Sequence, residues 1–301
     1  MCCIAFSLFI AVLVLHVSCL DPSLRIIGGS DVGEDELPYV ASLRLYLKPE
    51  GEINFKAELH ACSCAILTPT WTLTAAHCVS TNATGSTTIG TKIFKYEFKI
   101  LYGPITNKTT SKIVKLLNHP AFKASESPPI GFNDIALIKT EEIILRQYGH
   151  VGAMDYRSLI GLEATMVGYG LMNISGEIDV PANLGKPLQK LETVVIKCSP
   201  GYGTLRPILC ITRRCDAPSK VCPGDSGGPL LHSSSIIAVA TAAPSTACTE
   251  KDVKNKHFNA IGHEEKTKLR ITKRRVKTQT ASLYEERQRC TELVYQYFEK
   301  L

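Results

Sequence analysis

The chain has 301 residues, of which 45% are hydrophobic, and a formal net charge of +6 at neutral pH. Residues 1–250 contain 21 Lys and Arg and 21 Asp and Glu, so their charges cancel, whereas residues 251–301 contain 13 and seven and carry the whole excess. The dense basic run in this tail, residues 266–277, is accompanied by no aromatic interleaving and no binding fold, so we expect no nucleic-acid partner.

A short apolar segment, residues 4–17, lies near the N-terminus and ends at Val17-Ser18-Cys19. A membrane-spanning helix needs about 20 apolar residues, so residues 1–19 are predicted to form a secretory signal peptide rather than an anchor. We therefore expect a secreted, extracellular protein that does not associate with a membrane. Three Asn-x-Ser/Thr sequons agree with secretion and predict glycosylation at Asn82, Asn107 and Asn173.

Alternation of apolar and polar residues predicts β-strands. Apolar and polar side chains alternate over residues 41–47, which is the period of a half-buried strand. Residues 135–138 and 191–196 are further short apolar runs, and helical periodicity is sparse before residue 250. The pattern predicts an all-β protein.

The cysteines indicate an oxidising compartment. Three of the 12 cysteines fall in the signal segment, and the remaining nine cannot all pair with one another, so at least one is free or forms an intermolecular bond. A zinc site would be an alternative for four neighbouring residues, His60, Cys62, Cys64 and His77. Zinc sites usually space their cysteines by two to four residues, and a secreted chain favours disulfides, so we expect no metal and no cofactor.

Three short motifs supply a histidine, an aspartate and a serine. They are Thr74-Ala75-Ala76-His77-Cys78, Asn133-Asp134-Ile135-Ala136-Leu137 and Gly224-Asp225-Ser226-Gly227-Gly228-Pro229. A serine hydroxyl is a poor nucleophile near neutral pH, so an imidazole must take its proton and a carboxylate must hold that imidazole in the right tautomer. Glycines beside the serine let backbone amides face a developing oxyanion. Together the motifs predict a nucleophilic serine site.

In this order, and with similar short motifs between them, these segments resemble the chymotrypsin/trypsin-like serine endopeptidases over residues 26–248. The resemblance implies two packed six-stranded antiparallel β-barrels that form a protease domain over residues 26–250. It makes Ser226 the nucleophile, His77 the general base and Asp134 the orienting carboxylate, and it places the oxyanion hole at the amides of Gly224 and Ser226. The implied reaction is hydrolysis of peptide bonds through an acyl-enzyme, with protein or peptide substrates and serine protease inhibitors as partners.

The resemblance also implies activation by cleavage. Residues 20–25 would be an activation propeptide, cut after Arg25 so that the new Ile26 ammonium inserts beside Asp225. A buried carboxylate is costly when unpaired, and the incoming cation would neutralise it and order the oxyanion turn. The alternative is a loop that uses Gly28 and Gly29 only to turn the chain.

The family pattern suggests three disulfides, Cys62–Cys78, Cys198–Cys210 and Cys222–Cys248. It leaves Cys64, Cys215 and Cys290 without partners, and Cys64 stands where the family has a glycine.

By resemblance, the substrate pocket involves Lys220, Val221, Thr241 and Ala243. Lys220 stands at the pocket base, where a trypsin has Asp, so we expect a preference away from basic side chains and activation by a separate trypsin-like protease. The alternative is that Lys220 bends to solvent or pairs with Asp216 and leaves a small apolar pocket.

Residues 251–301 form a basic tail that departs from the family. The motifs of its last barrel strand and of its Trp-bearing terminal helix do not occur there, and Trp71 is the only tryptophan in the chain. The charge of the tail suits either an arm for a polyanion or a solvated extension. Two functions therefore stay open: an active secreted endopeptidase, or a non-catalytic binding protein or truncated or mis-spliced product with a defective pocket.

Overall fold

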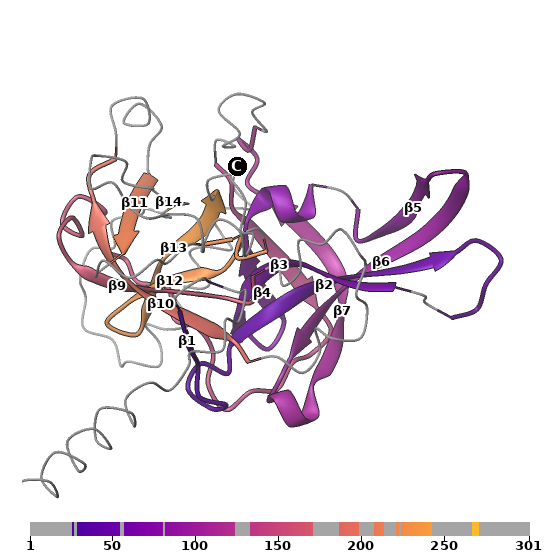
Figure 1. Ribbon diagram of the computed structural model, residues 1–301, viewed down its shortest axis with the longest axis horizontal. Helices are drawn as coiled ribbons and strands as arrows, with labels where there is room; N and C mark the ends of the chain where they lie inside the picture. Colours follow the sequence, from indigo (N-terminus) through magenta and orange to yellow (C-terminus); the bar gives the residue numbers. More distant parts are fainter. Residues whose placement is uncertain are drawn as a thin grey trace, which may run out of the picture.

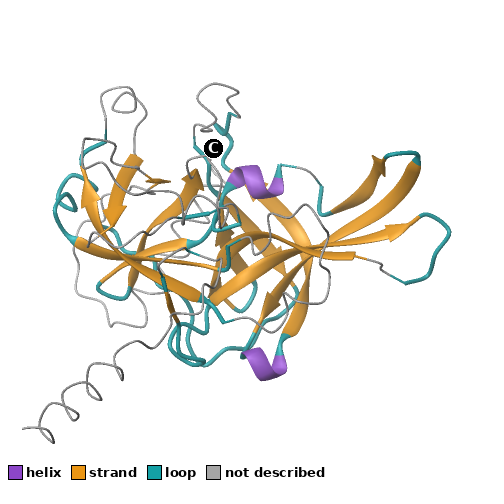
Figure 2. Ribbon diagram, in the orientation of Figure 1, coloured by secondary structure: helices purple, strands orange, loops and turns teal. Residues whose placement is uncertain are grey.

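The computed structural model describes part of the chain. It covers residues 26, 29–54, 57–80, 82–123, 133–170, 187–198, 208–213, 221–222, 224–242 and 267–270. Strands dominate these residues, and the helices among them are two short 3₁₀ turns, η1 (Ala76–Val79) and η2 (Ile105–Asn107) (Figure 2). The predicted all-β class is confirmed. In the part that the structure describes, no helix is long and apolar enough to cross a membrane.

The first barrel is built from the N-terminal strands. They are β2 (Val40–Pro49), β3 (Ala57–Thr68), β4 (Trp71–Thr74), β5 (Thr84–Ile89), β6 (Lys92–Tyr102), β7 (Thr109–Asn118) and β8 (Ala136–Thr140). Their order is β2-β3-β4-β8-β7-β6-β5, and an additional β2–β6 pairing closes a ring of six antiparallel strands with β5 attached to β6. In Figure 1, β5 and the adjoining part of β6 extend away from the barrel as an arm.

The second barrel is built from the strands that follow. They are β9 (Glu163–Gly168), β10 (Gln189–Ile196), β11 (Ile208–Arg213), β12 (Pro229–His232), β13 (Ser235–Ala242) and β14 (Thr267–Arg270), with β1 (Ser30–Asp31) at the edge. The order β1-β10-β11-β14-β13-β12-β9 is closed by an additional β10–β9 pairing, which again gives a ring of six strands. The two six-stranded antiparallel barrels predicted from the sequence are therefore confirmed (Figure 1).

Strand β14 comes from the basic tail. It pairs with β11 on one side and with β13 on the other, and so it fills the last place in the second ring. A barrel without this strand would expose two unpaired ladder edges. Part of residues 251–301 therefore belongs to the second barrel, whereas the sequence analysis ended the protease domain at residue 250.

Each barrel has its own apolar core because the inward positions of its strands are apolar. Leu43, Ile66 and Ile138 lie in the first core, and Met166, Val195 and Leu230 lie in the second; all six side chains are buried. Contacts between β3 and β12 and a bridge from Val151 to Ile236 join the barrels. The predicted His77 motif follows β4, the Asp134 motif lies between β7 and β8, and the Ser226 motif precedes β12. Both barrels therefore supply the predicted catalytic residues.

Candidate active site

The histidine and the aspartate of the predicted triad are hydrogen-bonded. His77 Nδ1 lies 2.7 Å from Asp134 Oδ2, and the His77 amide donates to Asp134 Oδ1 at 2.8 Å. Asp134 is buried, whereas 40% of the His77 side chain is exposed. A carboxylate only accepts hydrogen bonds, so Nδ1 carries a proton, and in the neutral imidazole Nε2 then presents a lone pair. This is the tautomer that a general base requires.

Local structure explains the position of each partner. His77 lies in η1, directly after β4, where a disulfide joins Cys78 to Cys62 on β3. Asp134 directly precedes Ile135 and β8 and follows Asn133, whose positive φ of 54° turns the chain. Because β4 and β8 are paired along their length, the two motifs meet at one end of this strand pair.

The serine turn packs against the histidine segment. The Ser63 amide on β3 donates to the Ser226 carbonyl at 2.8 Å. A Cβ at Gly227 would lie 2.2 Å from the Ser63 carbonyl oxygen and 3.2 Å from the Ala75 amide, so only glycine permits this approach. The structure thus brings Ser226 to the start of η1. Among the described side chains, no hydrogen bond joins Ser226 Oγ to His77, and His77 Nε2 lies 3.6 Å from Cys78 Sγ.

The predicted oxyanion donors lie in a glycine-rich turn. Gly224 and Gly227 have positive φ angles of 91° and 80°, which side chains disfavour. The Gly227 amide donates to Ala240 O, and the Gly228 amide donates to Asp225 O. Within the described part of the chain, no hydrogen-bond acceptor is found for the amides of Gly224 or Ser226. They are the pair that the sequence analysis predicts as the oxyanion hole.

Two side chains missed by the sequence analysis brace this turn from β3. The Gly224 carbonyl accepts hydrogen bonds from Ser63 Oγ at 3.0 Å and from His60 Nε2 at 2.8 Å. Ser63 Oγ in turn accepts from the Tyr169 amide at 2.9 Å, and His60 Nδ1 accepts from Ser42 Oγ at 2.7 Å. The peptide between Gly224 and Asp225 is therefore tied to the first barrel. Proximity of His60 and Ser63 to Cys62 was the only sequence signal for these contacts.

These contacts also exclude the zinc alternative. Both ring nitrogens of His60 are hydrogen-bonded, and Cys62 is joined to Cys78. The sulfurs of Cys62 and Cys78 lie within 4.8 Å of a His77 nitrogen, but disulfide sulfurs are not thiolate ligands.

Replacing Ser63 with alanine is expected to lower the free energy of unfolding by about 2 kcal/mol, because the Gly224 carbonyl loses a donor and the Tyr169 amide loses its acceptor. Urea unfolding measures the change. The matched control is Ser158→Ala, which removes an exposed hydroxyl bonded to Asp155 O and should change the stability by less than about 0.5 kcal/mol. Equal effects of the two substitutions would contradict the bracing role.

Asp225 is the most perturbed carboxyl group of the site. Its side chain is fully buried, Oδ2 accepts a hydrogen bond from the Cys222 amide at 2.8 Å, and Oδ1 has no hydrogen-bond partner in the described residues. Burial raises the pKa of Asp225 to about 7, although nearby backbone amides of Cys222 and Gly170 oppose the shift. A Cβ at Gly168 would lie 2.3 Å from Oδ1, so this glycine leaves room for the carboxylate.

Besides Asp225, the structure describes three of the predicted activation and pocket residues, Ile26, Val221 and Thr241. Ile26 is buried in the core of the second barrel, the barrel that also carries Asp225. Val221 and Thr241 are buried, and Thr241 Oγ1 has no hydrogen-bond partner in the part described. Arg25, Lys220 and Ala243 lie outside the described residues, as do residues 1–25, where the signal peptide and propeptide were predicted.

Two of the three predicted disulfides are present, Cys62–Cys78 and Cys198–Cys210. Cys222 is also disulfide-bonded, and its predicted partner Cys248 lies outside the described residues, with Cys215 and Cys290. Cys64 is a free, fully buried thiol, and burial raises its pKa, so it is an inert core residue.

Removing the Cys62–Cys78 disulfide by a double substitution to alanine is expected to destabilise the protein by about 3 kcal/mol, because the bond closes a loop of 16 residues and restricts the unfolded chain. Thermal unfolding of oxidised wild type and variant measures this loss. The matched control is Cys64→Ala, which keeps the disulfide: it should lose stability on reduction as wild type does, whereas the double variant should not respond to reducing agent.

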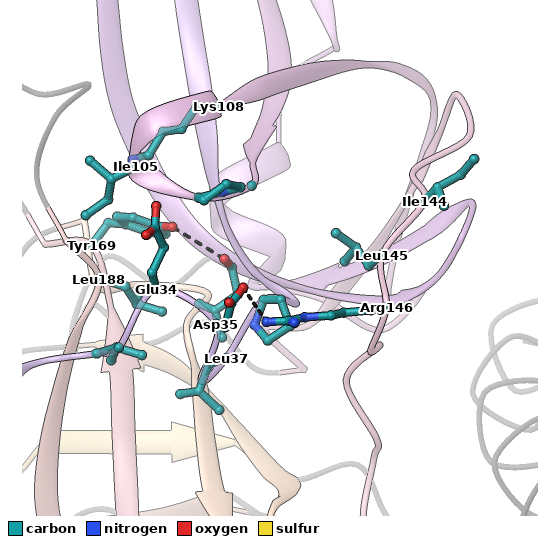
Figure 3. Close-up of a pocket in the computed structure, with 16 residues that line it drawn as sticks. Glu34, Asp35, Leu37, Ile105, Lys108, Ile144, Leu145, Arg146, Tyr169 and Leu188 are labelled. Carbon is teal, nitrogen blue, oxygen red and sulfur yellow. Dashed lines mark hydrogen bonds and ion pairs between the residues drawn. The ribbon is translucent and has the colours of Figure 1, made fainter.

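A cavity of about 180 Å³ lies outside the triad (Figure 3). Glu34, Asp35, Lys108, Arg146 and Tyr169 are among its lining residues. Asp35 forms an ion pair with Arg146, and the Lys108 ammonium lies 5.1 Å from the centre of the Tyr169 ring (Figure 3). None of the predicted catalytic or pocket residues lines this cavity.

Comparison with known proteins agrees with this geometry. The trypsin family model matches residues 26–261. Venom serine protease 34 of Apis mellifera is 30% identical over 217 residues, which are 69% of this chain and 48% of that protein, and human granzyme M is 26% identical over 236 residues, which are 75% and 81%. The chain thus spans about half the length of the bee protein.

Among solved structures, mouse neuropsin superposes with a TM-score of 0.54 at 18% identity, covering 81% of this chain and 93% of neuropsin. HL collagenase gives a TM-score of 0.55 at 19% identity and covers 82% and 93%. These likenesses concern the fold, and the family match covers most of the sequence. The chain belongs to the trypsin family of serine proteases.

Proposed function

We propose that this protein is a secreted serine endopeptidase, made as a zymogen and activated by cleavage after Arg25. The observation that carries the proposal is the hydrogen-bonded pair of His77 and Asp134 beside a serine turn that is held by Ser63. In this arrangement His77 Nε2 would take the Ser226 proton as Oγ attacks a peptide carbonyl, and Asp134 would stabilise the resulting imidazolium. The amides of Gly224 and Ser226 would bind the oxyanion, each contributing about 3 kcal/mol.

As the tetrahedral intermediate collapses to the acyl-enzyme, His77 would give this proton to the leaving amine; it would then activate the water molecule that hydrolyses the acyl-enzyme. Ser226 is held at its carbonyl by Ser63, while its hydroxyl makes no hydrogen bond to a described side chain. Catalytic hydrogen bonds that are long or missing in an apo structure often form when substrate binds, and 40% of the His77 side chain is exposed.

Asp225 supports the proposed activation step. A fully buried carboxyl group with an unpartnered oxygen in the described structure is a site for an incoming cation, and the Ile26 ammonium is the cation that cleavage would create. We further propose Cys222–Cys248 as the third disulfide and glycosylation at Asn82, Asn107 and Asn173; Asn82 and Asn107 are exposed. Protein substrates, an activating trypsin-like protease and serine protease inhibitors would be the partners.

Substrate preference is proposed from the pocket residues. Val221 and the buried Thr241 hydroxyl would contribute to the walls, with Ala243, and Lys220 would disfavour Arg or Lys side chains at the base. Rapid cleavage of Arg or Lys peptides by the activated protein would contradict this preference.

A second candidate function is binding without catalysis. It is favoured by one observation, the missing hydrogen bond between His77 and Ser226 among the described side chains. The test is to cleave the chain after Arg25 and to add an organophosphonate probe for active serine hydrolases. Covalent labelling of wild type and none of Ser226→Ala supports the endopeptidase. Equal absence of labelling in both supports the binding protein.

A further inference from the structure

The outer surface of the first barrel is unusually cationic. Strand β2 contributes Lys48, β6 three lysines, β7 two and β8 one, whereas Glu97 is the single acidic residue of these four strands; the other basic residue of β2, Arg44, is buried. This concentration lies in the part of the sequence whose total charge is zero. The excess is therefore local, and the pairing of the strands determines where it appears.

Strand register places lysines opposite one another. Three cross-strand pairs are directly opposed: Lys48 with Lys95, Lys99 with Lys112, and Lys115 with Lys139. Directly opposed residues have Cβ atoms about 5 Å apart, and like charges in such pairs destabilise a sheet. We call these six residues the lysine face.

All three pairs point outward. Lys95 and Lys99 are four residues apart on β6 and share a face, because the buried Phe98 and Ile100 point inward on either side of Lys99. On β7 the register shifts between Ile113 and Lys115. This bulge adds one residue, so Lys112 and Lys115, which would alternate in a regular strand, come to the same face.

Four of the six residues of the lysine face are exposed, Lys48 and Lys99 are half-buried, and the face keeps a positive balance. Lys95, Lys112, Lys115 and Lys139 are exposed. Glu97 forms an ion pair with Lys99 at 3.2 Å, and Glu141, whose amide bonds to the Lys112 carbonyl, follows β8. Glu58 on β3, directly opposite Tyr46, accepts a hydrogen bond from the Tyr46 hydroxyl on this face, so three acidic residues stand beside six lysines. Like charges so placed are neutralised by an anionic partner that spans several of them.

The chemistry of the surface favours a sulfated polysaccharide. The rings that could stack with nucleic-acid bases already lie under ammonium groups, since Lys99 Nζ is 5.0 Å from the Tyr46 ring centre and Lys139 Nζ is 5.7 Å from that of Trp71. An acidic peptide could not add as a strand, because β6 and β7 are paired on both sides. Ser86, opposite Lys95, adds a hydroxyl that can hydrogen-bond sulfate.

From these observations we propose that the lysine face binds a linear sulfated polysaccharide. Sulfates would be held by ammonium groups as point charges, which require no fixed angle. The site runs along the outer surface of the first barrel onto the arm formed by β5 and the adjoining part of β6. It uses none of the residues assigned to catalysis, so this proposal is independent of the proposed protease activity.

The test measures binding of the full-length protein to heparin at increasing salt concentration. The variant K112Q/K115Q/K139Q is expected to bind about 100- to 1,000-fold more weakly than wild type, since each lysine near an anionic surface contributes about a factor of five to ten. The matched control R146Q/R157Q/K197Q removes three exposed cations elsewhere and should bind within about twofold of wild type.

Thermal unfolding checks the fold of both variants. The lysine-face variant should be at least as stable as wild type because opposed like charges are removed; Lys115→Gln alone provides a milder substitution, with a binding loss of about five- to tenfold.

Several results would overturn the proposal. They are failure of wild type to bind heparin at physiological salt, equal losses in the two triple variants, and a full loss in the tail variant K273Q/R274Q/R275Q with the lysine face intact. Tighter binding to polyglutamate or to single-stranded DNA than to heparin would overturn the choice of partner.

Discussion

Replacing His77 with alanine in the protein cleaved after Arg25 is expected to lower kcat for a peptide substrate by about 10⁶-fold, because the Ser226 hydroxyl then has no base to accept its proton. Asp134 would lose the imidazole that it hydrogen-bonds at 2.7 Å and could not replace it. The measurement is steady-state hydrolysis of a panel of peptide substrates by wild type and variant, with KM determined separately from kcat.

Non-additivity provides the control for this prediction. If His77 and Ser226 act as one unit, the double variant H77A/S226A should be no slower than either single variant. The residual rate would come from the oxyanion amides of Gly224 and Ser226, whose backbone the substitutions leave in place. Independent, multiplying losses would show that the two side chains do not act together, and wild-type turnover in H77A would exclude the proposed mechanism.

The second large effect concerns pH and the buried Asp225. For the uncleaved chain, we expect this carboxyl group to lower the free energy of unfolding by about 4 kcal/mol as the pH rises from about 4 to 7. The pKa in the folded protein is about 7, above the ordinary value of 3.8. Within this window the unfolded chain has released the proton and the folded chain still binds it, so raising the pH favours the unfolded state. Above the folded pKa the loss is complete.

Urea unfolding of wild type and Asp225→Asn at several pH values isolates this contribution. The asparagine does not titrate, and its oxygen can still accept the hydrogen bond of the Cys222 amide. All other titrating groups therefore contribute equally to the pH dependence of stability in the two proteins. The stability of wild type relative to Asp225→Asn should fall as the pH rises from about 4 to 7 in the uncleaved form, and this fall should largely vanish after cleavage, when the Ile26 ammonium stabilises the carboxylate. If the stability difference between wild type and Asp225→Asn did not depend on pH, the raised pKa of Asp225 would be contradicted. If its dependence on pH were unchanged by cleavage, insertion of the Ile26 ammonium would be contradicted.

Much of the fold could be predicted from sequence because the evidence is local. Alternation over residues 41–47 lies within β2, and the apolar runs at 135–138 and 191–196 overlap β8 and β10. The His77 and Asp134 motifs could also be found, since each combines a short apolar strand with a polar residue at its end. Strand β14 could not, because its place between β11 and β13 depends on partners more than 20 residues away rather than on a motif of its own.

The bracing of the serine turn also escaped prediction. His60 was weighed only as a metal ligand, and Ser63 was passed over, although both bond to the carbonyl of Gly224, more than 160 residues away. Hydrogen bonds between barrels depend on how two strands cross in space. A pair of neighbouring polar residues on one strand does not specify that crossing.

The sequence by itself determined the chemistry available to this protein: a histidine, an aspartate and a serine in motif order, glycines around the serine, and cysteines that suit disulfides. The tertiary structure alone decided which groups meet, because side chains hydrogen-bond and charges repel over a few ångströms, whatever their separation along the chain. It placed Asp134 against His77, tied the Gly224 turn to β3, and opposed lysines whose charges cancel in the sum over residues 1–250.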